Sequence, residues 1–251
     1  MKKVLKSPEP EELTKYKQRY TSQLRKWGKH ASKKSDLKSA IQSTLVSDQR
    51  GICTYCETRI REKFCSVEHF IPCEQSTPEQ NYDLDWQNML AVCMLPGAIE
   101  DDNVDNSQLP HKYPCCGKAK ANFVPDGRLL NPLELPTSRL FRFKREDGEM
   151  LPDEANCEKE GIPIASVQFT IQTLGLNVER LKRLRLAVIK KIEEELNFYD
   201  DGIIDPTTIE KQVASEYFDN GKENYPRFFT TIRWALSKGA EDHLLDISYL
   251  G

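Results

Sequence analysis

The stretch that decides the fold of this chain lies between Gly51 and Pro125. In order it contains Cys53-Thr-Tyr-Cys56, Glu68-His69-Phe-Ile-Pro72, Asn88-Met-Leu90, Cys93 and Cys116-Gly-Lys118-Ala-Lys120. The sequence thus supplies a cysteine pair, an acid followed by a histidine, an asparagine, and cysteines at two later positions. Metal binding and hydrolysis use these residue types, so we expect the rest of the chain to hold this stretch in place.

The cysteines predict a structural zinc site. A Cys-x-x-Cys pair can bend around one tetrahedral ion, and two later cysteines can complete a closed four-thiolate shell. The alternative is that they are small buried apolar residues, but the flanking Gly51 and a charged segment favour zinc for the first pair. Cys115 stands beside Cys116, so either could be the fourth ligand. The predicted ligands are Cys53, Cys56, Cys93 and Cys116.

His69 and Glu68 are candidates for hydrolytic chemistry. They end a predicted strand from Phe64 to Phe70, and adjacent side chains of a strand point to opposite faces unless the backbone turns, as Pro72 makes it do. A neutral histidine can take a proton from water, and a carboxylate can hold a hard divalent ion. The alternative for a lone histidine is a structural role, and the accompanying residues favour function.

Together these motifs resemble the zinc-stabilised HNH, or ββα-metal, nuclease motif. More closely, the chain is similar to the HNH nuclease subunit, often called PtuB, of Septu and retron-associated anti-phage systems. Flanking segments share the likeness, among them Asn131-Pro-Leu-Glu134 and Thr170-Ile-Gln-Thr-Leu-Gly-Leu-Asn177. The resemblance implies an α+β fold, with a zinc-stabilised ββα-metal core, N-terminal helices and a mainly helical C-terminal region.

The resemblance also implies roles for individual residues. His69 would be the general base that activates water, Asn88 would orient His69 or its loop, and Glu68 would bind a catalytic Mg²⁺ or Mn²⁺. The family usually has a His, Asn or Asp metal ligand directly after the last zinc cysteine, where this chain has Gly117. Lys118 and Lys120 follow on the expected helix, where they could contact phosphate or simply face solvent.

The function implied is metal-dependent hydrolysis of DNA phosphodiester bonds by the effector nuclease of a defence complex. The implied partners are DNA and a PtuA-like ATPase subunit, with a retron reverse transcriptase and its msDNA or RNA as further candidates. A different class of function also fits the residues, namely a zinc-stabilised adaptor for nucleic acid or protein whose nuclease site has decayed. Gly117 favours this alternative, whereas the intact Glu68, His69 and Asn88 oppose it.

Charge is unevenly distributed along the chain. Residues 1–38 hold twelve Lys or Arg against four acids, whereas residues 51–125 hold six against eleven. Basic segments flanking an acidic, metal-binding core suit an enzyme that grips phosphates beside its site. We find no apolar run of membrane length and no signal peptide. Together with eight cysteines, this predicts a cytoplasmic protein that uses its cysteines for metal instead of disulfides.

We divide the chain into four regions. These are a basic N-terminal helical segment (1–50), the nuclease core (51–125), a hairpin and linker (126–160), and a helical region that contacts a partner (161–251). Apolar periodicity predicts helices over 13–27, 35–50, 164–174, 177–199, 206–218 and 226–238, and strand signals predict a hairpin over 140–151. Residues 96–114 read as an inserted loop. We expect Asn177 to cap its helix, Gly239 to end the last one, and a chain cut after Gly161 to keep a folded core.

Overall fold

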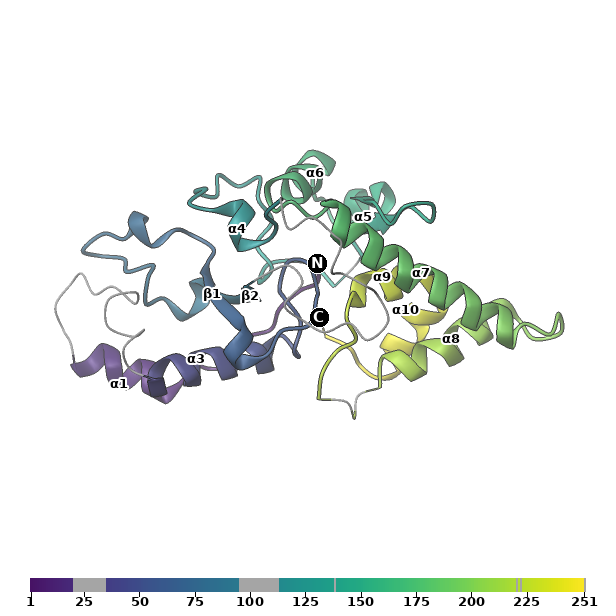
Figure 1. Ribbon diagram of the computed structural model, residues 1–251, viewed down its shortest axis with the longest axis horizontal. Helices are drawn as coiled ribbons and strands as arrows, with labels where there is room; N and C mark the ends of the chain where they lie inside the picture. The colour runs from purple at the N-terminus through teal and green to yellow at the C-terminus, as the bar shows by residue number, and fades with distance from the viewer. Residues whose placement is uncertain (20–34, 95–112, 138, 220, 222, 251) are drawn as a thin grey trace.

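The fold is mixed α+β, with a mostly helical C-terminal half. It was obtained as a computed structural model, and the structure describes residues 1–19, 35–94, 113–137, 139–219, 221 and 223–250. The molecule is elongated, with the N-terminal helices and the first strands at one end and the C-terminal helices at the other (Figure 1). The sequence prediction of fold class therefore holds in this coarse form.

Within the described residues, two N-terminal helices flank the segment that bears the motif. They are α1 (Glu11–Arg19) and α3 (Ser35–Asp48). In α3 the predicted apolar face is buried, with Leu37, Ile41 and Leu45 at spacings of four residues. The part of the first predicted helix beyond Arg19 lies outside the described residues.

The motif segment forms a small antiparallel sheet. Strand β1 (Cys65–His69) pairs with β2 (Met89–Cys93), and the register sets Cys65 opposite Cys93 and His69 opposite Met89. Three short 3₁₀ helices lie around the sheet, namely η2 (Glu62–Phe64), η3 (Cys73–Gln75) and η4 (Trp86–Asn88). The short helix α4 (Gly117–Lys120) follows later in the chain. His69 is the last residue of β1 and pairs with Met89, the first residue of β2. Asn88 directly precedes Met89, so the register brings it close to His69.

The predicted hairpin is confirmed, and the charged segment after it contains a helix that the sequence analysis did not predict. Strand β3 (Phe141–Phe143) pairs antiparallel with β4 (Met150–Pro152). The segment between Pro152 and Pro163 contains the helix α5 (Glu154–Lys159), whose first turn is capped by Asp153 accepting from the Asn156 amide at 3.1 Å. Cys157 is fully buried on this helix. The charged residues of this segment lie on the solvent-facing side of α5, and Cys157 lies on its buried side.

The helices α6 (Ile164–Thr173), α7 (Glu179–Tyr199) and α8 (Pro206–Tyr217) form where apolar periodicity predicts them. Asn177, however, does not cap α7. Its side-chain amide donates to the Met150 carbonyl at 2.9 Å, and its oxygen accepts from the Met150 amide at 2.8 Å. Asn177 therefore pins the second hairpin to the start of α7.

The last predicted helix is in fact two, α9 (Phe229–Ala235) and α10 (Ser237–Asp246). Gly239 lies inside α10 and does not end a helix. A Cβ at this position would be 2.3 Å from the Cβ of Glu210 on α8. Glycine at this position allows α8 and α10 to approach closely. The sequence suggested that Gly239 ends a helix, but the residue is there for packing between two helices.

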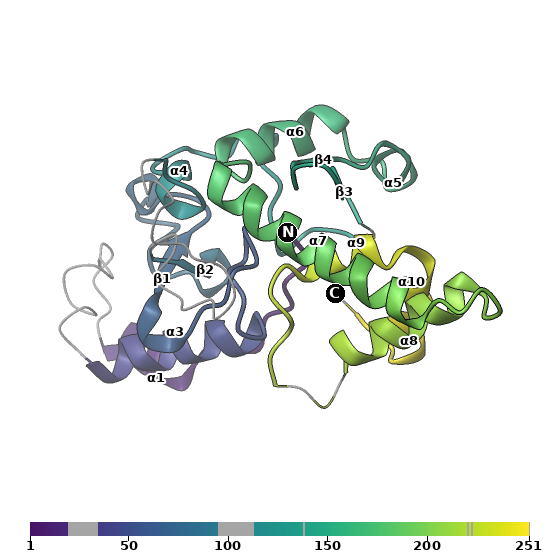
Figure 2. The same cartoon turned by 45° about the vertical axis from the view of Figure 1, so that its right-hand side comes forward.

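The helices α6 and α7 share one apolar core with the motif segment, whereas α8, α9 and α10 pack around a second buried cluster that includes Phe229 and Leu236. A single cluster of buried residues contains Cys53 and Leu90 together with Ile171 and Leu181. The backbone also joins the two parts, since the Cys116 amide donates to the Leu174 carbonyl at 2.8 Å. Figure 2 shows α6 and α7 lying against the part that carries α4, β1 and β2. The expectation that the first 161 residues fold by themselves is therefore unsupported.

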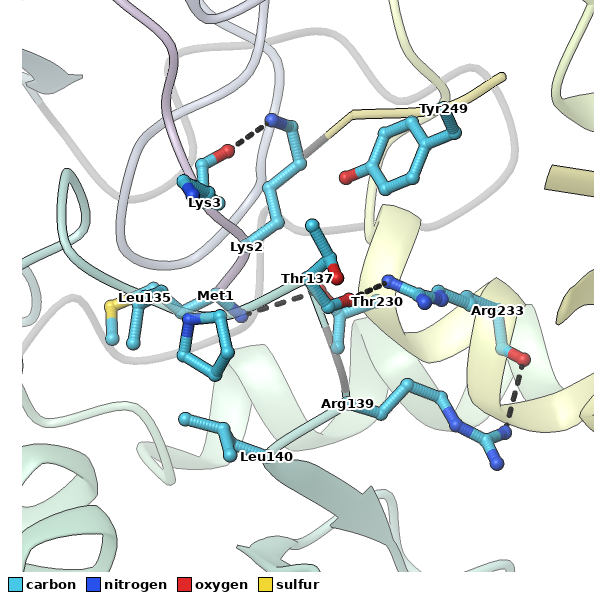
Figure 3. Close-up of a pocket in the computed structure, with 11 residues that line it drawn as sticks. Met1, Lys2, Lys3, Leu135, Thr137, Arg139, Leu140, Thr230, Arg233 and Tyr249 are labelled. Carbon is cyan, nitrogen blue, oxygen red and sulfur yellow. Dashed lines mark hydrogen bonds between the residues drawn. The ribbon is translucent and has the colours of Figure 1, made fainter. Parts of the chain in front are cut away.

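A second junction lies where the N-terminal residues, the segment around Leu135 and α9 meet (Figure 3). The Arg233 guanidinium on α9 donates to the Thr137 carbonyl at 2.7 Å. The cavity between these elements measures about 10 Å³, which is near the lower limit for one water molecule. This junction is therefore a packed contact between regions and has no room for a small-molecule ligand.

We predict that a chain ending at Gly161 is unfolded. It would lose the apolar partners of the motif segment on α6 and α7, and also the α9 residue Thr230, whose amide donates to the Glu57 carboxylate at 2.8 Å. Far-ultraviolet circular dichroism and a thermal melt of residues 1–161 would test this. A cooperative transition close to that of the full chain would contradict the prediction.

Candidate metal centre and hydrolytic site

Four cysteines from distant parts of the chain form one buried group. Their Sγ atoms all lie within 4.8 Å of one another, with Cys53 to Cys116 at 3.8 Å and Cys56 to Cys93 at 3.7 Å. Four sulfurs held about 2.3 Å from a tetrahedral ion would be about 3.8 Å apart. The group contains Cys116 and not its neighbour Cys115. Its spacing and donor set therefore fit a structural zinc ion.

Local backbone geometry delivers these thiols to one point. Cys53 and Cys56 lie in the turn after α3, and the Cys53 Sγ accepts from the Cys93 amide at the end of β2 at 3.4 Å. Cys116 precedes α4 with a positive φ of 56°. This conformation is uncommon outside glycine and costs free energy. The fold thus accepts local strain to bring the fourth thiol to the other three.

The electrostatics of the cluster favour a cation. The pKa of the Cys56 thiol lies well below its ordinary value because the thiols of Cys115, Cys116 and Cys53 hydrogen-bond to it. By contrast, burial raises the pKa of Cys116. A buried group of four sulfurs therefore holds one thiolate easily and needs a positive ion to hold more.

His69 is held through one of its two ring nitrogens. Its Nε2 lies 3.0 Å from the Asp83 carbonyl oxygen and 3.5 Å from the Asp83 carboxylate. A carbonyl only accepts hydrogen bonds, so this contact places the hydrogen on Nε2 and leaves the lone pair of the neutral ring on Nδ1. The side chains of His69 and Asp83 are 12% and 6% exposed. The imidazole is therefore oriented, nearly buried, and able to accept a proton at Nδ1.

Asn88 holds two backbone segments that lie near this histidine. Its Oδ1 accepts from the Ile71 amide at 2.7 Å, and its Nδ2 donates to the carbonyls of Ile71 and Tyr82, both at 2.8 Å. Ile71 follows His69 closely, and Tyr82 precedes Asp83. Asn88 thus ties the loop that carries the imidazole to the segment that carries its hydrogen-bond acceptor.

Glu68, Gly117 and Lys120 form a second contact beside the histidine. The Lys120 ammonium lies 2.8 Å from Glu68 Oε1 and donates to the His69 carbonyl at 3.0 Å. A Cβ on Gly117 would be 2.5 Å from Glu68 Oε2. The helix α4 therefore presses its glycine against the carboxylate and turns its last lysine onto the same group.

The two predicted substrate lysines lie in different environments. Lys118 is exposed. Lys120 is only 2% exposed, because its ammonium is enclosed between Glu68 and the end of β1. Sequence reasoning placed both on the outer face of a helix, but α4 has only four residues, and its last one turns inward. Lys120 therefore forms an ion pair with Glu68 and partly neutralises its carboxylate.

For a divalent ion this site offers one protein carboxylate, that of Glu68, as a ligand. Glu68 offers hard oxygen atoms, and Gly117 leaves the space beside Oε2 free of a side chain. Lys120 already neutralises part of the charge at the other oxygen. Substrate phosphate and water would have to supply most of the coordination shell.

We predict that Asn88→Ala lowers the free energy of unfolding by about 2–3 kcal/mol, because it leaves buried backbone groups at Ile71 and Tyr82 without partners. Urea unfolding of the variant against the wild type would measure this. Asn122→Ala is the matched control, since Asn122 is exposed. Equal stability of the Asn88 variant and the wild type would contradict the prediction.

Comparison with known proteins relates the chain to a nuclease. No family model matches it. Over 165 residues it is 33% identical to an Escherichia coli protein described as "Retron Ec83 putative HNH endonuclease". This match covers 58% of the chain and 62% of the relative, so the chain spans less than two thirds of the relative's length. The chain is a distant homologue of this retron-associated protein, in agreement with the resemblance seen in its motifs.

Among the described residues, no helix combines the length and the apolar character needed to cross a bilayer.

Proposed function

We propose that the chain is a metal-dependent HNH endonuclease that hydrolyses phosphodiester bonds in DNA. The observation that carries the proposal is the orientation of His69. Its Nε2 is held by the Asp83 carbonyl at the end of β1, beside Glu68, and β1 pairs with the strand that ends at Cys93 of the four-cysteine cluster. Distant homology to the Escherichia coli protein supports the same reaction class.

In the proposed reaction, Nδ1 of His69 takes a proton from the attacking water, and the Asp83 carbonyl and carboxylate stabilise the imidazolium that forms. Glu68 would hold a Mg²⁺ or Mn²⁺ ion, which would supply positive charge to stabilise the phosphoryl oxygens and the leaving oxygen. Lys120 fixes the position of the Glu68 carboxylate, and Asn88 fixes the loop that carries His69. The zinc held by Cys53, Cys56, Cys93 and Cys116 is structural in this proposal, because all four positions of its shell are filled by protein.

DNA is the proposed substrate because the charge pattern provides a grip for phosphates. Exposed Lys118 lies two residues after Cys116 on α4, close in sequence to the site. Exposed residues of the basic segment 1–38, such as Lys15 and Arg19, supply further positive charge, whereas Lys2 is buried. We extend the proposal to an effector nuclease of an anti-phage complex. In that complex a PtuA-like ATPase subunit would regulate cleavage, alongside a retron reverse transcriptase and its msDNA.

A zinc-stabilised adaptor is the second candidate, and one observation favours it. The Lys120 ammonium already occupies one side of Glu68, and Gly117 adds no metal donor. An adaptor needs no free carboxylate at this position. It would, however, have no need for an imidazole held in one tautomer, which is why we favour the nuclease.

A plasmid-cleavage assay tests the choice. We expect the purified chain to nick or linearise plasmid DNA with Mg²⁺ or Mn²⁺, and EDTA to stop the reaction while the zinc stays bound. The assay is run with and without the co-expressed ATPase subunit, since that subunit is proposed to regulate cleavage. No cleavage in any mixture, from a folded and zinc-loaded protein, would favour the adaptor.

A further inference from the structure

The turn between α7 and α8 forms a projecting tip at the end of the molecule away from β1 and β2 (Figure 1). Each residue from Asp200 to Pro206 is exposed. The helices α7 and α8 carry the turn outward from the second buried cluster, in which they pack with α9 and α10. The tip is therefore open to a partner without obstructing the proposed hydrolytic site.

Large apolar side chains are displayed on this tip. Phe198 is 82% exposed and Ile203 is 87% exposed, and Ile204 is also exposed. Single exposed apolar residues are ordinary on protein surfaces. Here three stand within seven residues, Phe198 at the end of α7 and the two isoleucines in the turn after it, and two of them are almost fully in solvent. Exposed apolar surface of this kind is what protein interfaces bury.

The turn that displays them is ordered. Asp201 Oδ1 accepts from the amides of Ile203 and Ile204 at 2.9 and 3.0 Å, and Asp205 accepts from the Thr208 amide at the start of α8. Behind the turn, the Tyr217 hydroxyl on α8 donates to the Glu195 carboxylate on α7 at 2.8 Å. The apolar side chains are thus presented by a preformed structure, which reduces the entropy lost on binding.

The charge around the patch selects the kind of partner. Residues 192–210 contain seven Asp or Glu and not one Lys or Arg. Two of these acids pair with cations outside the stretch, Glu193 with Arg145 and Glu195 with Lys191, and the other five leave the stretch acidic. This stretch would repel nucleic acid and the anionic surface of a bacterial membrane. A protein surface with Lys and Arg around an apolar groove is complementary to it.

We propose that the tip, defined by Phe198, Ile203 and Ile204 with the acids Asp200 and Asp201, docks into an apolar groove bordered by Lys and Arg on a partner protein. The apolar side chains supply affinity, and the acids direct the approach and set the register. The test uses the ATPase subunit as the partner protein. The inference rests on the proposed function in this one respect, because the proposed function names that subunit.

The experiment titrates the purified ATPase subunit against the full-length chain and its variants by calorimetry. We expect F198S/I203S to weaken binding at least tenfold, while L245S, which changes an equally apolar residue that is 76% exposed on α10, binds as the wild type does. D200N/D201N keeps the oxygens that accept from the turn while removing two charges. We expect this variant to bind two- to fivefold more weakly and to lose much of the salt dependence.

The other outcomes overturn the inference. These are no binding by the wild type, equal binding by F198S/I203S, or binding of DNA or phosphatidylglycerol vesicles that needs the tip. DNA cleavage by the isolated chain is measured on the same preparations and should be unchanged in F198S/I203S. A failure of the docking inference is thereby separated from a failure of the nuclease proposal, because each has its own readout.

Discussion

Cys53→Ser and Cys116→Ser are each expected to abolish zinc binding and the cooperative fold. Binding of a structural zinc ion contributes folding free energy on the order of 10 kcal/mol, which is comparable to the whole stability of a domain. Here the four thiols come from the turn after α3, from β2 and from the start of α4, and the cluster is part of the shared apolar core. Loss of the ion would therefore disconnect the elements that the ion holds together.

Elemental analysis for zinc and a thermal melt measure the two effects together. Cys73→Ser is the control, because Cys73 is partly exposed on η3 and lies outside the four-cysteine group. It should keep both the metal and the transition. Cys115→Ser addresses the choice that the sequence left open, and retention of zinc in this variant is expected. A Cys53 variant with wild-type metal content and melting temperature would rule out the zinc site.

Much of the fold was predictable because local patterns dominate it. The apolar spacing of four in α3, the turn signal between β3 and β4, and Pro206 at the start of α8 all act within a few residues of the chain. The tertiary packing of these elements agrees with their local preference. The cysteine spacing was equally informative, since the chemistry of one ion constrains four positions at once.

The errors share a physical cause, namely contacts between residues far apart in sequence. Asn177 has the residue type of a helix cap, yet it bonds Met150 on the second hairpin, 27 positions away. Gly239 has the residue type of a helix stop, yet it permits the contact between α8 and α10. In both cases the residue type indicated a special structural role, but the local sequence could not show which distant residue it contacts.

In the candidate site, too, local motifs were predictable and contacts between distant residues were not. The motif gave His69, Glu68 and Asn88, but not Asp83, which contacts the imidazole through both its backbone and its carboxylate. Asp83 lies in the polar segment before η4, where Asn, Asp and Tyr are ordinary loop residues. Nothing in its sequence context sets it apart. Likewise, the burial of Lys120 follows from the approach of α4 to β1, which no local pattern encodes.

His69→Ala is expected to lower plasmid cleavage by about 10²- to 10⁴-fold, the contribution typical of a positioned general base. The fold should remain, because within the described part of the chain the polar contacts of the His69 ring are to Asp83, and β1 keeps its backbone pairing with β2. Cleavage rates, zinc content and the melting temperature are measured on one preparation. His243→Ala provides the same chemical change on α10, in the region opposite the site, and should cleave at the wild-type rate.

Two further measurements separate the loss of a base from the loss of a structural contact. Free imidazole added to His69→Ala should restore part of the activity, because the removed ring leaves space beside the Asp83 carbonyl that the reagent can occupy. DNA affinity should be unchanged, since the proposed phosphate contacts lie at Lys118 and in the basic N-terminal segment. Full activity in His69→Ala would remove the histidine as the base. The hydrolysis would then have to depend on Glu68 and its ion, and Glu68→Gln would become the decisive variant.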